Sequence, residues 1–301
     1  MQPPRLRYRT ADWHCHTLAS ALRGIDMDGL LPAGKRRRRD ATLTDASEWL
    51  QLAAEIKDVS LQYMGDPMEI YLCESAGEYD SAKAKIQAEF VTRIARFSFA
   101  WNAFEATIKA LNVPAHPEAK NSVAKAATWF IKKNGVRTAD FPGYLHLLKH
   151  AVGLAKVYPD LQDVILPPEK DRLRISEAGY GVELCREMRN KLAHGAAMIP
   201  EPEGWRWGSG FRDKEMLALI NILVKLLLIT IQMMVFIRLG PKMNALTEDL
   251  LLYDESGPDL LEYFRHIHID LPTYQKILDG DEQMEPLSQV DWGDRCAAAG
   301  A

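Results

Sequence analysis

Apolar residues recur every three or four positions along the central part of this chain, which is the spacing of amphipathic helices. The strongest pattern is a heptad stripe with alternating spacings of four and three, made by Phe90, Ile94, Phe97, Trp101, Phe104, Ile108 and Leu111. Pro114 closes this segment, and a helix over 80–112 would be roughly 50 Å long at about 1.5 Å per residue. We therefore expect this helix to be the spine of a bundle.

Five other segments have helical spacing and recognisable ends. Asp45 and Glu48 predict a capping box at the start of a helix that Gly65 ends. The sequence contains neither an internal repeat nor a convincing set of strands. The predicted fold is therefore all-α, an antiparallel bundle of about five to six helices. Its predicted helices cover residues 45–63, 80–112, 118–133, 144–157, 176–194 and 213–239.

The segment 213–239 is apolar enough to suggest a membrane-spanning helix. Asn221, Lys225 and Gln232 interrupt it, and they fall within about 40° of one another on a helical wheel. A lysine in the middle of a lipid-facing helix is costly, whereas one polar seam suits the central helix of a bundle. We therefore expect a bundle helix and no membrane.

Charge divides the chain into three parts. Residues 1–40 carry a net charge of +5, residues 41–240 are neutral and residues 241–301 carry −9. We expect a largely irregular basic N-terminal arm over 1–40, a helical bundle over 41–240, and an acidic C-terminal extension with short helices over 241–301. A basic run such as 35–39 is more often a solvated tail than a binding site, and the alternatives are contact with the acidic extension or with nucleic-acid phosphate.

Cysteine usage and the N-terminus indicate a cytoplasmic protein. The four cysteines form no Cys-x-x-Cys pair, and the first residues contain no apolar secretory signal. His14 and His16 flank Cys15 without a second ligand pair nearby, and His146 and His150 lack the glutamate of a zinc-protease motif. We therefore expect neither a metal nor a cofactor.

The candidate chemistry lies in the string Arg189-Asn190-Lys191-Leu192-Ala193-His194. Gly195 follows directly, so a helix that begins near Ser176 is expected to end here. Arg189 lies about 140° around that helix from the histidine, while Asn190 and Lys191 share its face. On spacing alone the simplest interpretation is a helix that ends in solvated charges, because Arg9 and His14 have the same separation in a segment without a helical pattern.

The longer string 188–195 resembles the signature of the HEPN superfamily, in which an arginine and a polar residue precede a histidine by four to six positions. The aromatic segment 97–108 is similar to the helix before the motif in the Apea-like branch. The resemblance covers roughly residues 80–240, and outside the motif it is one of pattern rather than identity. It implies a helical, dimeric, metal-independent ribonuclease that leaves a 2′,3′-cyclic phosphate, as in many toxin–antitoxin and anti-phage systems.

On this interpretation Arg189, Asn190 and His194 are the catalytic residues, and Arg186 and Lys191 bind RNA. Histidine acts as either acid or base, and the planar guanidinium suits a phosphate that acquires charge. Because one chain supplies one motif histidine, a homodimer through the motif helix would supply both acid and base. An antitoxin or a defence-system protein is a further expected partner.

Two other interpretations remain. In the first, the chain is a non-catalytic HEPN-like module that binds RNA or nucleotide, or that mediates dimerisation. In the second, it is an interaction protein that uses its acidic extension. Some toxins of the superfamily carry a modified tyrosine two residues after the histidine, where this chain has Ala196. Control by that modification is therefore not expected.

Overall fold

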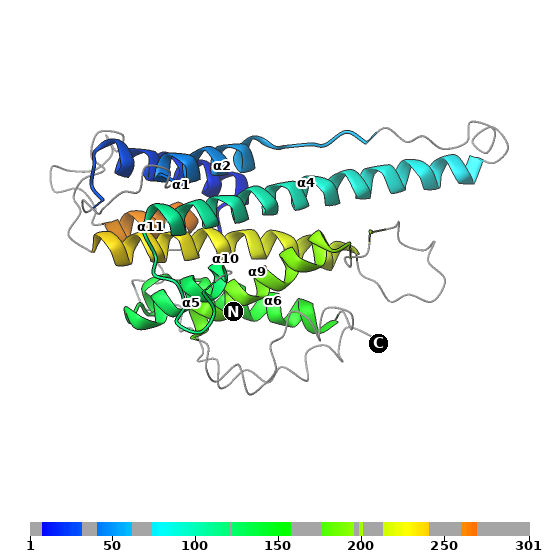
Figure 1. Ribbon diagram of the computed structural model, residues 1–301. Helices are drawn as coiled ribbons and strands as arrows, with labels where there is room; N and C mark the ends of the chain where they lie inside the picture. Colours follow the sequence, from blue (N-terminus) through cyan, green and yellow to red (C-terminus); the bar gives the residue numbers. More distant parts are fainter. Residues whose placement is uncertain are drawn as a thin grey trace, which may run out of the picture.

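The computed structural model describes residues 8–31, 41–61, 74–120, 122–157, 176–195, 199–200, 213–240 and 260–269. These residues form eight α-helices and one 3₁₀ helix, Thr138–Asp140, and contain no strand (Figure 1). The predicted all-α fold is confirmed, with more helices than the five to six expected. The α-helices are α1 Ala11–Met27, α2 Leu43–Glu55, α4 Glu74–Ala110, α5 Val123–Lys133, α6 Tyr144–Val157, α9 Glu177–Ala193, α10 Asp213–Leu239 and α11 Leu260–His268.

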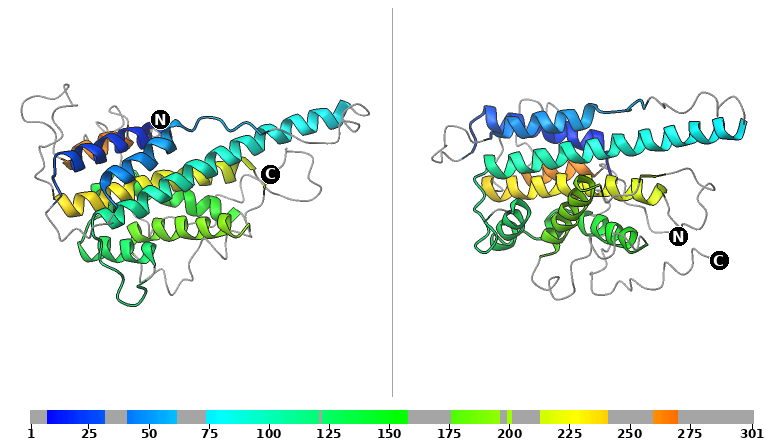
Figure 2. Two further views of the ribbon diagram at one scale, coloured as in Figure 1. Left: turned by 45° about the horizontal axis from the view of Figure 1, so that its top comes forward. Right: turned by 45° about the vertical axis from the view of Figure 1, so that its right-hand side comes forward.

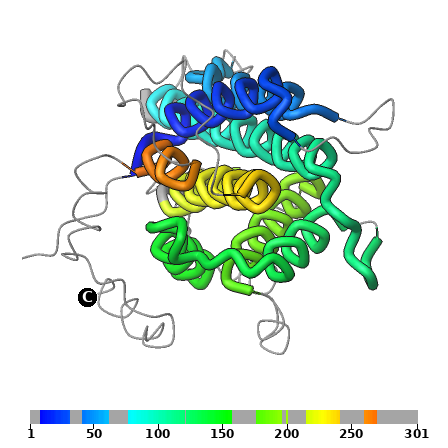
Figure 3. Tube along the Cα trace, turned by 90° about the vertical axis from the view of Figure 1, so that its left-hand side faces the viewer, coloured from blue at the N-terminus to red at the C-terminus, as the bar shows by residue number. Residues whose placement is uncertain are grey.

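The apolar helix α10 lies at the centre of the bundle. Figure 3 shows it in yellow, with the other helices arranged around it. None of its described side chains, over 215–239, is exposed. Within the described residues α10 is the one helix long and apolar enough to cross a membrane, and 78% of its most apolar stretch is buried inside this protein. Its neighbours are α1, α4, α5, α6, α9 and α11.

The long helix α4 lies beside α10 and carries the predicted aromatic stripe. Phe97 and Phe104 are fully buried and Trp101 nearly so, while Ile94 is half-buried. The helix spans 37 residues, and its N-terminal part extends beyond the other helices (Figure 2). Because α4 and α10 run in the same direction, the helices of the bundle do not alternate in direction throughout (Figures 1 and 2).

The expectation of a largely irregular arm over 1–40 is wrong over α1. This helix buries Leu18, Leu22 and Ile25 in the same core as α10, and it forms a hairpin with α2 (Figure 1). Asp26 joins the two helices, since its carboxylate accepts the Thr44 hydroxyl hydrogen at 2.6 Å. At the other end of the chain α11 also contributes to this core. The basic run 35–39 lies outside the described residues.

Helix α2 begins and ends earlier than its sequence pattern predicts. Its N-cap is Thr42, whose hydroxyl accepts the Asp45 amide hydrogen at 3.1 Å, so Asp45 completes the capping box instead of starting it. The helix ends at Glu55 because Arg96 of α4 donates to the carbonyls of Ala53 and Ile56, at 3.0 and 2.6 Å. The chain then continues without helix over residues 56–61.

A close contact between α6 and α9 depends on Gly181. Tyr144 of α6 is fully buried, and its hydroxyl donates to the Ala178 carbonyl at 2.6 Å. A Cβ atom on Gly181 would lie 2.2 Å from that hydroxyl oxygen. Glycine is therefore required where the tyrosine crosses α9.

The two ends of the described chain meet beside the polar seam of α10. Tyr8 forms an isolated antiparallel bridge with Ile269, and its hydroxyl donates to the Gly143 carbonyl at 2.9 Å. On α10 the Lys225 amino nitrogen lies 5.4 Å from the centre of the Tyr8 ring, and Gln232 donates to the Phe264 carbonyl of α11 at 3.2 Å. Lys225 and Gln232 of the predicted seam thus lie where the two ends of the described chain meet.

Two buried histidines lie at the same junction. The rings of His14 on α1 and His268 on α11 are stacked, with their centres 5.8 Å apart. His268 places Nδ1 2.8 Å from the Phe264 carbonyl and Nε2 3.1 Å from the Pro142 carbonyl, while His14 Nε2 has no hydrogen-bond partner within the described residues. Burial lowers the pKa of His268 to about 4 and also lowers the pKa of His14.

Gly181→Ala is expected to lower the free energy of unfolding by about 1–3 kcal/mol, because the new methyl group overlaps the buried Tyr144 hydroxyl. The matched control is Gly153→Ala on α6, where an added Cβ meets no atom within 4 Å. In that control the free energy of unfolding should rise by about 0.5–1 kcal/mol, because alanine favours the helix more than glycine does. Urea unfolding measures both changes, and equal effects would contradict the assigned contact.

The histidine pair should make the fold sensitive to acid. A histidine whose pKa is lowered on folding binds more protons in the unfolded chain, so stability is fully present above about pH 6.5 and is lost as the pH falls. Each such group contributes a slope of about 1.4 kcal/mol per pH unit between its unfolded and folded pKa values. His268→Gln should therefore flatten the dependence of urea stability on pH between about 6 and 5. The control is His16→Gln, which changes an exposed histidine of α1. An equally steep slope in the two variants would contradict the assignment.

Candidate functional site at the end of α9

Helix α9 carries the motif and begins where the sequence predicts. Its N-cap is Ser176, whose hydroxyl accepts the Gly179 amide hydrogen at 3.2 Å. Its buried side packs against α10, where the Cys185 thiol lies 3.4 Å from the Leu223 carbonyl oxygen and Met188 is fully buried. The motif therefore extends from a helix that the core holds firmly along one side.

The end of α9 also lies where the sequence predicts. His194 is the C-cap residue, and its backbone amide donates to the Asn190 carbonyl at 3.0 Å. Gly195 follows with a φ of +66°, the left-handed conformation that favours glycine after a helix. The last turn thus places His194 at the point where the chain leaves the helix.

The side chains of Arg189 and His194 are both exposed, and Asn190 is half-buried. No hydrogen bond or ion pair holds the side chain of Arg189 or His194 within the part of the chain that the structure describes. Helix geometry separates the two residues by about 140° around the axis. The structure therefore presents a cation and an imidazole at one helix end, on different sides of it.

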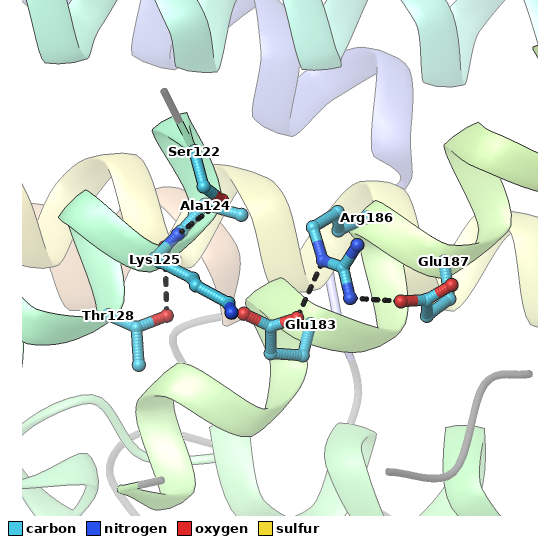
Figure 4. A network of polar contacts seen from close by, with 7 residues as sticks. All are labelled: Ser122, Ala124, Lys125, Thr128, Glu183, Arg186 and Glu187. Atoms are coloured by element: carbon cyan, nitrogen blue, oxygen red, sulfur yellow. Dashed lines mark hydrogen bonds and ion pairs between the residues drawn. The ribbon is translucent and has the colours of Figure 1, made fainter. Parts of the chain in front are cut away.

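The two expected RNA-binding residues are placed differently from Arg189. Arg186 donates from Nε to Glu183 at 2.7 Å and from Nη2 to Glu187, so its guanidinium lies between two carboxylates (Figure 4). Lys191 is 8% exposed, and it too interacts with neighbouring groups. Arg189 is accordingly the motif cation that the described structure presents to solvent.

The sequence interpretation did not single out the two carboxylates. Glu183 is buried, with 6% of its surface exposed, although a buried carboxylate is costly unless it is paired. Burial raises the pKa of the Glu187 carboxyl, while the neighbouring Arg186 and Lys191 lower it in part. The spacing of three between Glu183 and Arg186 is the signal that predicts such a pair on a helix.

Helix α5 flanks the first half of α9. Its N-cap Ser122 accepts the Lys125 amide hydrogen at 3.3 Å, which starts the helix five residues later than predicted. The Lys125 side chain points toward Glu183 in Figure 4. The charged cluster of α9 therefore continues onto a neighbouring helix.

The described residues around the motif contain no cluster of metal-ligating side chains. Among the residues that the structure describes, no group of three or more His, Cys, Asp or Glu side chains could hold a metal ion. In the His146 and His150 pair on α6, the Nδ1 atom of His146 lies 3.0 Å from the hydroxyl oxygen of Tyr8. Burial raises the pKa of the Cys15 thiol to about 12 and also raises that of Cys185, which keeps both thiols protonated and unreactive.

Comparison with known proteins gives no match: no family model, no curated protein and no solved structure is significantly similar to this chain.

Proposed function

We propose that this protein is a metal-independent endoribonuclease of the HEPN type, acting as a toxin or an anti-phage effector. The observation that carries the proposal is the solvent-exposed Arg189 and His194 at the end of a helix whose string resembles the HEPN signature. RNA contains its own nucleophile, the 2′-hydroxyl. A protein that supplies an acid, a base and a positive charge therefore needs no metal for cleavage.

In the proposed reaction the 2′-oxygen attacks the adjacent phosphorus while the bond from phosphorus to the 5′-oxygen breaks. A histidine accepts the proton of the 2′-hydroxyl, and a second group donates a proton to the departing 5′-oxygen. Arg189 stabilises the charge that develops on the phosphate, and Asn190 orients the histidine or a phosphate oxygen. The products are a 2′,3′-cyclic phosphate and a 5′-hydroxyl.

The proposed active site is shared between two chains. Each chain supplies one motif histidine, whereas the reaction needs an acid and a base at the same phosphate. A two-fold axis beside the ends of the α9 helices would bring together two histidines and two arginines. Arg186 already has two carboxylate partners, so a role in binding RNA would require it to exchange one of them for phosphate.

A second candidate is a non-catalytic helical module that binds RNA or nucleotide. The observation that favours it is the separation of Arg189 and His194 around α9, because no described contact holds them toward one another. Expression in a host separates the two functions, since a ribonuclease toxin slows growth and a binding module does not.

The purified protein is expected to cleave RNA in the presence of EDTA. His194→Ala and Arg189→Ala should each lower the rate by about 10²–10⁴-fold, whereas His16→Ala, a control at an exposed histidine of α1, should not. Mass spectrometry of the products should detect a cyclic phosphate, lighter by one water than a linear 3′-phosphate. Cleavage that depends on added divalent metal would disprove the mechanism.

A dimer of one wild-type chain and one His194→Ala chain, purified through two different tags, tests the shared site. Loss of either acid or base should leave it with about 10²–10⁴-fold less activity than the wild-type dimer. Two independent sites would instead retain about half of the activity. The control dimer pairs a wild-type chain with a His16→Ala chain, and a protein that is monomeric at assay concentration would also refute the shared site.

A further inference from the structure

Helix α5 presents one strongly basic face to solvent. Lys125, Lys132 and Lys133 are exposed, and Trp129 between them is half-buried. With a spacing of 100° per residue these four positions fall within about 100° around the helix. The opposite face packs into the core through Ala127, Phe130 and Ile131. We call the four residues the basic face of α5.

The charge around this face departs from that of the whole chain. The segment 109–137 contains six Lys or Arg against one Glu, a net charge of +5 in a chain with −4. All six cations are exposed. Arg137 is ion-paired with Asp140 just beyond the segment, at 2.9 Å. Three of these cations, Lys125, Lys132 and Lys133, belong to the basic face of α5, and such a cluster of positive charge suits a polyanion.

An aromatic ring within the basic face distinguishes nucleic acid from an acidic peptide as its partner. The Lys133 amino nitrogen lies 4.8 Å from the centre of the Trp129 ring. Proteins that bind single strands without sequence preference combine cations for the phosphates with aromatic rings on which bases stack. An acidic peptide uses the lysines but gives the ring no flat partner.

The basic face lies within reach of the motif for a strand of modest length. Along α5, the distance from Lys125 to Lys133 is about 12 Å. The Lys125 side chain points toward Glu183 of α9. Along α9, the distance from Glu183 to His194 is about 16 Å. A path along both helices is therefore roughly 30 Å, which about ten stacked nucleotides cover at about 3.4 Å each.

We propose that the basic face of α5 binds single-stranded RNA and holds it alongside the end of α9. The inference rests on the proposed function, since it assigns the surface that retains the substrate of that reaction. A base stacks on Trp129 in place of the Lys133 amino group, and Lys132 and Lys133 contact phosphates. The cleaved phosphate lies further along the same strand, at the motif.

The test measures binding of a 20-nucleotide single-stranded RNA to the His194→Ala protein, which keeps the RNA intact. Adding Lys132→Gln and Lys133→Gln should weaken binding at least about tenfold at low salt. Each phosphate contact contributes about 0.7 to the slope of log affinity against log salt, so this slope should become shallower by about 1.4. The arginine pair, Lys132→Arg and Lys133→Arg, should restore both values.

The matched control is Lys83→Gln with Lys85→Gln on α4, where Lys83 lies 5.5 Å from the centre of the Tyr79 ring, much as Lys133 lies over Trp129. Equal binding losses at the two places, or no RNA binding at all, would overturn the inference. So would poly-glutamate of equal length competing as well as the RNA does. If one of those outcomes occurs and the wild-type protein still cleaves RNA, the inference about α5 is wrong but the proposed function is not. If the basic face binds RNA as expected and the wild-type protein does not cleave it, the proposed function is wrong but the inference about α5 is not.

Discussion

The structure depends on burying α10, a helix without an exposed described side chain over 215–239. Each large apolar side chain that leaves water stabilises the fold by about 1.5–3 kcal/mol, so a helix that is apolar all round needs neighbours on every side. Six other helices provide them. A membrane provides the same kind of surroundings, which explains why the composition of this segment alone does not separate a core helix from a spanning one.

Two polar residues of α10, Lys225 and Gln232, lie where α1 and α11 pack against this helix. Gln232 is fully buried, and its amide nitrogen is satisfied by the Phe264 carbonyl of α11. Burial lowers the pKa of the Lys225 amino group, and the charge of Asp12 on α1 offsets part of that shift. Helices α1 and α11 cover this seam, although Gln232 Oε1 is buried without a hydrogen-bond partner among the described residues. The rings of His14 and His268 are stacked where these two helices meet.

Short sequence patterns predict those structural features that depend on interactions between residues near one another in the chain. Ser176 and Gly195 define the ends of α9, as caps do in any helix, and the heptad stripe of α4 is buried except at Ile94, which is half-buried. The end of α2 was not predictable in this way, because it depends on Arg96, forty residues further along the chain. Helix α1 was missed since its buried side includes His14 and Cys15 and several alanines, which make a weak apolar stripe. The carboxylates around Arg186 and the burial of Lys191 likewise depend on how α9 packs.

Helix geometry bears directly on how a motif of this spacing acts. Five residues separate Arg189 from His194, so the two side chains leave α9 in directions about 140° apart. In one chain that angle works against both groups reaching the same phosphate. A two-fold axis beside the ends of the α9 helices leaves the angle within each chain unchanged, but in the proposed dimer it would add a second histidine and a second arginine to the site. In the proposed mechanism the reason for the dimer is the need for a second histidine, and the basic face of α5 contributes affinity that the motif alone does not supply.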